Sequence, residues 1–142
     1  MTRLHLAIAI VAGLLFANSA KAAGLLIIAN PSVVSPAPLT LSQIAAIYLL
    51  RVTAWPDGSH IVPVNRDATS ETRAEFTADV LQADDASLAA YWNEMHYMGK
   101  LPPVVQESEQ AMLAFIRNVP GSIGYISAST APAGVKVLAH VP

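Results

Sequence analysis

The hydrophobic pattern of this chain alternates between short continuous apolar runs and longer segments in which apolar residues recur every three or four positions. Short runs are typical of buried strands, and the longer spacing is typical of helices that cover a sheet. Expected strands occupy residues 25–29, 61–64, 123–126 and 135–138, and expected helices begin near residues 40, 70, 85 and 108. This order predicts crossover connections, a largely parallel sheet flanked by helices, and an α/β domain of two or three layers.

Capping residues mark where several of these helices begin. Thr40 followed by Gln43 forms a capping box, in which the two side chains satisfy each other's backbone N–H groups. Asp84 or Asp85 can cap the third helix, and Ser108 can cap the fourth. The predicted helix starts therefore have a local chemical basis besides their periodicity.

The expected third helix carries an apolar stripe and two large residues outside it. The stripe consists of Leu88, Tyr91, Trp92 and Met95. Residues at this spacing are more often core than exposed surface. Tyr97 and Met98 lie off the stripe, so they are better candidates for contact with a partner.

The segment from Ile61 to Phe76 carries the candidate binding chemistry. Its β-branched residues predict a strand that reaches Arg66, and the hydroxyl and acidic residues after Arg66 predict a helix from about Ser70 to Gln82. The first N–H groups of a helix lack intrahelical partners and lie at the positive end of its dipole. A guanidinium and hydroxyls beside them can form an anion site, outside the carboxyl ends of the strands where α/β sheets bind ligands.

Residues 1–22 have the pattern of a secretory signal peptide. Arg3 provides a basic start, residues 6–16 form an apolar core, and a small-x-small cleavage site follows. This apolar core is too short to span a membrane. We therefore expect an exported protein whose mature part, residues 23–142, is one domain without a transmembrane segment.

Charge and composition exclude several classes of function. With Arg3 and Lys21 removed in the signal, six basic residues remain against ten acidic ones, a formal charge of −4 that argues against nucleic acid or anionic membranes as partners. The chain has no cysteine, so a thiol nucleophile is excluded. Its histidines do not form an i, i+4 pair, and no Gly-x-Ser-x-Gly motif is present. We expect no metal, no cofactor, no catalytic residues and no enzyme activity.

Four segments, in their order, resemble the phosphate-binding periplasmic proteins of ABC transporters, within the type II periplasmic-binding-protein superfamily. They are residues 41–48 (LSQIAAIY), 55–58 (WPDG), 66–76 and 120–126 (PGSIGYI). The resemblance spans nearly the whole mature chain but only about half of such a protein, and it is strongest to small single-lobe members. It implies one lobe of the type II fold, a phosphate-like oxyanion as ligand, and an ABC permease or another envelope protein as partner.

The resemblance also assigns a ligand site. In the family, an arginine is followed four, five and six residues later by Ser-Gly-Thr at a helix N-terminus. Arg66, Ser70 and Thr72 keep these spacings, and Glu71 takes the place of the glycine. A carboxylate there suits the helix dipole but repels a phosphate. Arg73, the next residue, is expected on a solvated helix face.

Two interpretations of this segment remain open. In the first, Arg66, Ser70 and Thr72 bind an oxyanion and the chain is a solute-binding protein. In the second, the segment is only a helix cap with Arg66 paired to Asp67 or Glu71, and the chain is a periplasmic protein–protein interaction module that has lost solute binding. The direction of the Glu71 carboxylate distinguishes them, because a carboxylate folded back onto the helix start or onto Arg66 would occupy the anion site itself.

Overall fold

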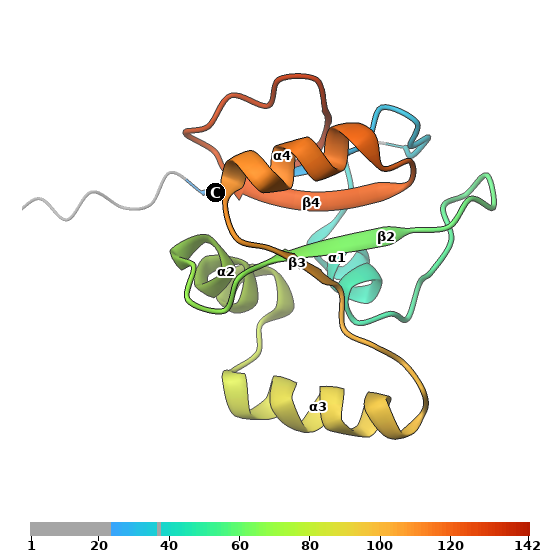
Figure 1. Cartoon of the computed structure of the whole chain (residues 1–142), viewed down its shortest axis with the longest axis vertical. Coiled ribbons are helices and arrows are strands. Elements are labelled where there is room, and N and C mark those ends of the chain that lie inside the picture. Colours follow the sequence, from blue (N-terminus) through green and yellow to red (C-terminus); the bar gives the residue numbers. More distant parts are fainter. Residues whose placement is uncertain (1–23, 37) are drawn as a thin grey trace, which may run out of the picture.

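The computed structural model describes residues 24–36 and 38–142, so the expected signal peptide lies outside the described residues (Figure 1). Its elements are β1 (Leu25–Ala29), α1 (Leu41–Tyr48), β2 (Val62–Arg66), α2 (Glu71–Phe76), the π-helical segment η1 (Thr77–Leu81), α3 (Asp85–Tyr97), β3 (Val104–Gln106), α4 (Glu109–Asn118), β4 (Ser122–Ser127) and β5 (Lys136–Val141). The predicted α/β class is confirmed. Within the described ranges, no helix combines the length and apolar character needed to cross a membrane.

The five strands form one mixed sheet in the order β3-β2-β4-β1-β5. β2 pairs in parallel with β3 and with β4, whereas β1 pairs antiparallel with β4 and with β5. Four strands therefore share one direction, as the prediction of a largely parallel sheet required, and β1 runs against them. The carboxyl ends of β2, β3 and β4 consequently meet at the same edge of the sheet.

Helices cover both faces of this sheet (Figure 1). On one face, α1 and the α2–η1 segment enclose a core centred on three aromatic side chains. The rings of Phe76 and Tyr125 stack with centroids 4.0 Å apart, and Tyr48 lies 4.6 Å from Phe76. Because all three rings are fully buried, this cluster fixes the α2–η1 segment against β4.

The opposite face of the sheet is covered by α4. Its predicted inward residues Met112, Leu113 and Ile116 are buried, as expected, against β-strand residues that include Val64. Gly124 of β4 permits this approach, because a Cβ atom there would lie 2.5 Å from the sulfur of Met112.

The helix α3 lies apart from the sheet, beyond β3 (Figure 1). Met95 is its buried residue, whereas Leu88, Tyr91 and Trp92 are half-buried, so the prediction that the stripe is core holds fully for Met95 alone. Tyr97 is 84% exposed, in agreement with its position outside the stripe.

The sequence pattern missed two local features. The strand β3 has three residues and lies at the edge of the sheet, with Val104 and Val105 each 47% exposed, so it is too short and too exposed to show a periodic signal. The helix expected to continue to Gln82 is α-helical only to Phe76 and continues as the π-helical segment η1. It ends at Gln82, which adopts a left-handed conformation with φ of 50°.

The two ends of the described domain lie side by side in the sheet. Leu25 of β1 pairs with Val141 of β5, so residue 24 adjoins residue 142.

Candidate anion site at the junction of β2 and α2

Arg66 is the last residue of β2 and lies at the carboxyl edge of the sheet. It stands two positions after Val64, which faces α4, so by the alternation of strand residues its side chain extends to the same face. There Nη2 donates a long hydrogen bond of 3.4 Å to the carbonyl oxygen of Glu107, just before α4. The side chain is only 9% exposed, and its buried Nε has no hydrogen-bond partner.

The Arg66 guanidinium forms no ion pair within residues 24–36 and 38–142. The pairing with Asp67 or Glu71 that the helix-cap interpretation requires is therefore not present. Burying a guanidinium without a counter-charge lowers the stability of the fold, because the group loses its hydration and gains no acceptors in exchange. The position is suited to an anion that is bound from outside the chain.

Asp67 directs its carboxylate to its own loop and not to Arg66. Its Oδ1 accepts hydrogen bonds from the backbone N of Thr69 at 2.7 Å and from the Thr69 hydroxyl at 2.6 Å. These bonds from Thr69, with a smaller contribution from the Arg66 charge, lower the pKa of Asp67. The loop is closed further by a 3.1 Å bond from the backbone N of Ser70 to the Asp67 carbonyl.

Ser70 caps α2, as its position in the predicted helix start suggested. Its Oγ accepts a 3.2 Å hydrogen bond from the backbone N of Arg73, which leaves the hydroxyl proton available to an acceptor. The backbone N–H groups of Glu71 and Thr72 have no partner in the described part of the chain, as is normal for the first positions of a helix. Hydroxyl and backbone donors therefore converge at this helix start.

Glu71 is exposed, and its carboxylate makes no hydrogen bond or ion pair with the described residues. It folds neither onto the first-turn N–H groups nor onto Arg66, so it does not fill the anion site. Its negative charge nevertheless remains at the first helical position, where it opposes a bound anion through space.

Arg73 differs from the expectation of a solvated helix face. It is half-buried, and its Nη1 donates a 2.8 Å hydrogen bond to the carbonyl oxygen of Arg66. Periodicity assigned it to the polar side of the helix, but the long side chain reaches back across the helix start to the strand. Arg73 thereby ties α2 to the end of β2.

Asn65 and Tyr125 support the site from within the domain, and sequence reasoning missed both. The backbone N of Arg66 lies 3.1 Å from the Tyr125 hydroxyl and 3.1 Å from Asn65 Oδ1, and the Tyr125 hydroxyl donates to the same Oδ1. Burial raises the pKa of Tyr125 to about 12, so the hydroxyl keeps its proton at neutral pH. A polar residue inside each apolar strand was the available signal, because buried polar atoms require partners.

No family model and no curated protein sequence matches this chain. Solved structures do. An ABC-type phosphate transport receptor from Vibrio cholerae has a TM-score of 0.64 at 22% identity, over 81% of this chain and 45% of that chain. A phosphate ABC transporter substrate-binding protein with bound phosphate from Clostridium perfringens has a TM-score of 0.63 at 24% identity, over 81% and 44%. PstS from Borrelia burgdorferi has a TM-score of 0.61 at 19% identity, over 81% and 46%.

The similarity to these structures confirms the predicted resemblance at the level of the fold. The chain spans a little less than half the length of each of the three neighbours. At these identities the comparison establishes a shared architecture, and the chemistry of this chain has to be argued from its own residues.

Proposed function

We propose that this protein binds phosphate or a closely related oxyanion at the junction of β2 and α2. The observation that carries the proposal is the buried guanidinium of Arg66, which has one long hydrogen bond, an unpartnered Nε and no ion pair to the described residues. An oxyanion supplies both the missing charge and the missing acceptors, and a guanidinium binds such groups through two parallel N–H donors.

The start of α2 provides the remaining donors. The Ser70 hydroxyl and the N–H groups of Glu71 and Thr72 lie at the positive end of the helix, where anions are stabilised. The Thr72 side chain is half-buried beside them and adds a hydroxyl. Binding requires these groups to be fixed, which the Asp67 loop and the Arg73 bond to the Arg66 carbonyl accomplish.

Two features are expected to keep the affinity modest. The Glu71 carboxylate repels an anion at the helix start, and a single lobe cannot enclose and desolvate a small ion as two closing lobes do. We therefore propose binding without catalysis, in connection with ABC-type transport, with a permease or another envelope protein supplying the second wall. The proposed location is the periplasm, which rests on the signal-like sequence of residues 1–22.

Calorimetric titration of the purified protein with sodium phosphate tests the proposal. Saturable heat is expected for the wild-type protein and for Arg51→Gln, which removes an exposed arginine elsewhere. Arg66→Gln is expected to remove that heat while leaving the circular dichroism spectrum unchanged. No saturable heat from the wild-type protein up to millimolar phosphate, or equal binding by Arg66→Gln, would contradict the proposal.

An interaction module is the second candidate function, and the exposed end of α3 is the observation that favours it. Tyr97 is 84% exposed and Met98 is 62% exposed, although both are residue types that stabilise interfaces. On this view the lobe docks onto an envelope protein and no longer binds a solute. The phosphate titration separates the two candidates, because only the first requires Arg66-dependent heat.

A further inference from the structure

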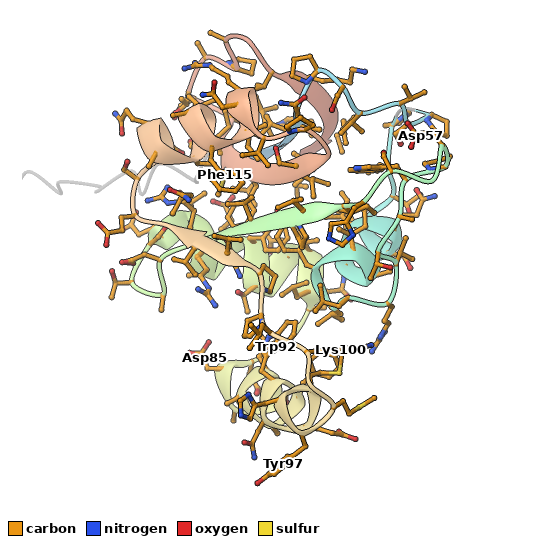
Figure 2. All side chains as sticks on the ribbon, turned by 45° about the vertical axis from the view of Figure 1, so that its right-hand side comes forward. Asp57, Asp85, Trp92, Tyr97, Lys100 and Phe115 are labelled. Atoms are coloured by element: carbon orange, nitrogen blue, oxygen red, sulfur yellow. The ribbon has the colours of Figure 1, made fainter. Side chains whose placement is uncertain are left out.

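A cavity of about 220 Å³ lies between α3 and the segment formed by α2 and η1. Its walls include Asn65 from β2, Arg73 and Thr77 from the α2–η1 segment, and Asp85, Leu88 and Trp92 from α3. Figure 2 shows Trp92 between α3 and the rest of the chain, whereas Tyr97 projects from the opposite side of the helix. Arg66, Ser70, Glu71 and Thr72 do not line this cavity, so it is separate from the anion site.

One wall of the cavity presents hydrogen-bond donors. The 2.8 Å bond from Arg73 Nη1 to the Arg66 carbonyl fixes the guanidinium and leaves its other N–H groups for the cavity. Asn65 Oδ1 already accepts from the Tyr125 hydroxyl and from the backbone N of Arg66, so the Nδ2 donor is the part of this amide left to face a ligand. A held guanidinium beside an amide donor is suited to a carboxylate.

The opposite wall presents a carboxylate. Asp84, and not Asp85, caps α3, through a 2.7 Å bond to its Oδ1 from the backbone N of Ser87. Within the described residues Asp85 has no hydrogen bond or ion pair, although it lines the same cavity as Arg73. Two opposite charges that face one cavity without meeting are suited to a ligand that carries both charges.

The apolar lining and the size of the cavity limit the kind and the size of the side chain that the ligand can carry. Leu81, Leu88 and the Trp92 ring supply an apolar wall. The volume of about 220 Å³ is below the roughly 300–1,000 Å³ typical of sites for drug-sized ligands. We propose that this cavity binds a zwitterionic amino acid with a small aliphatic side chain. Arg73 and Asn65 hold its carboxylate, Asp85 holds its ammonium group, and its side chain lies against Trp92.

Such a ligand would bridge α3 to the body of the domain. Met95 is the one buried residue of α3, and the helix otherwise contacts the body through half-buried side chains and the hydrogen bond from the Tyr91 hydroxyl to the Leu49 carbonyl. A ligand that contacts both walls of the cavity adds to these few contacts between α3 and the body. Ligand binding is therefore expected to slow amide hydrogen exchange in α3 more than in β1 or β4.

Titration of the full chain with L-alanine, L-valine and L-leucine tests the proposal, with calorimetric heat and Trp92 fluorescence as the two measurements. Saturable binding of at least one is expected, and the fluorescence change should disappear in Trp92→Phe while the heat remains. For leucine, 4-methylpentanoate lacks the ammonium group and 3-methylbutylamine lacks the carboxylate. Each is expected to bind at least tenfold more weakly than leucine. No saturable binding of any of the three amino acids up to 10 mM, a concentration well above ordinary dissociation constants of about micromolar to millimolar, would overturn the proposal.

Side-chain variants localise the binding. Arg73→Gln and Asp85→Asn are each expected to weaken amino-acid binding at least tenfold, whereas Asp79→Asn, on an exposed residue outside the cavity, is expected to have no effect. If Arg73→Gln does not fold, Asp85→Asn still decides, because the Asp85 carboxylate makes no hydrogen bond or ion pair with the described residues. Unchanged binding by Asp85→Asn, or 4-methylpentanoate binding as tightly as leucine, would refute the assignment of the ammonium group. Arg66→Gln should leave amino-acid binding intact, which separates this proposal from the anion site.

Discussion

Replacing Arg66 with methionine removes a buried charge while keeping an unbranched side chain that fills the space of the arginine's aliphatic part. In the wild-type protein the guanidinium has one hydrogen bond, at 3.4 Å, and a buried Nε without a partner. A buried unsatisfied donor costs about 1–3 kcal/mol, and exchanging buried charges for apolar groups is often neutral or stabilising by about 1–4 kcal/mol. The variant also loses the weak bond to the Glu107 carbonyl, which contributes at most about 1 kcal/mol.

Together these magnitudes predict that Arg66→Met leaves the free energy of unfolding unchanged or raises it by about 1–2 kcal/mol. For a domain of this size, 1 kcal/mol corresponds to a change in Tm of about 4 °C. The same substitution should abolish phosphate binding. The residue would then be retained at the expense of stability, as is common for groups that bind ligands.

Thermal and urea unfolding with and without phosphate provide the assay, with sodium chloride at equal ionic strength as the reference. A phosphate concentration of 100 times Kd should stabilise the wild-type protein by about 2.7 kcal/mol. Arg66→Met should show only the small general stabilisation that phosphate gives many proteins. A variant destabilised by more than about 1 kcal/mol, or one that keeps the full phosphate effect, would refute the reasoning.

Three further substitutions test other parts of the structure. Glu71→Gly should strengthen phosphate binding about two- to fivefold in calorimetric titration, because it removes a carboxylate that competes with the bound anion for the positive end of the helix dipole, an interaction of about 0.3–1 kcal/mol. Glu71→Gln separates the charge from the backbone effect, and weaker binding by both variants would contradict this reasoning. Gly124→Ala should lower the free energy of unfolding by about 1–3 kcal/mol in urea, because the new Cβ would meet the Met112 sulfur at 2.5 Å. The loss in Gly124→Ala combined with Met112→Ala should be smaller than the sum of the losses in the two single variants, because the clash is then absent; a strictly additive loss would contradict the clash. Burial raises the pKa of Tyr125 to about 12, so the stability it contributes is complete below the unfolded value of about 10 and is lost as the pH rises toward 12. Alkaline unfolding monitored by circular dichroism should therefore begin near pH 10, with a smaller dependence on pH in Tyr125→Phe; an equal dependence in both proteins would be inconsistent with this assignment.

Much of the fold was predictable because its signals are local. Thr40 and Gln43 form both bonds of the predicted capping box, and Ser108 caps α4 as expected. The strand at 25–29 has the predicted bounds. Each of these features depends on residues that are neighbours in the chain, so a sequence pattern can contain them.

Features that depend on distant residues were not predictable. The apolar stripe of α3 indicates which side of the helix is apolar, but it does not indicate how closely that side packs, and Trp92 is in fact half-buried beside a cavity. The three residues of β3 become a strand because they pair with β2 from Val64 onward. Tertiary contacts determine both outcomes.

In the candidate site, too, the local features were predictable from the sequence and the contacts between distant residues were not. The spacing of Arg66, Ser70 and Thr72 was visible in the sequence. In the structure Arg66 ends β2, Ser70 caps α2 and Thr72 lies in the first turn of α2, and their binding of one anion stays a prediction. The support from Asn65 and Tyr125 joins β2 to β4, residues about 60 positions apart, and no local pattern reveals it. Whether the Arg66 guanidinium was paired could be answered only from its surroundings in three dimensions.

The adjacency of residues 24 and 142 makes this domain topologically insertable. A chain that enters along β1 and leaves along β5 does so at one place, because Leu25 and Val141 are paired. A host protein could accept such a unit in a surface loop with little change to its own backbone, and linking the two ends would permit new termini elsewhere, for example at the exposed turn Asp57-Gly58. The domain is thus a module that can be moved between chains. Because residues 24 and 142 lie at the same edge of the sheet as the carboxyl ends of β2 and β4, a host protein would stand next to the proposed anion site.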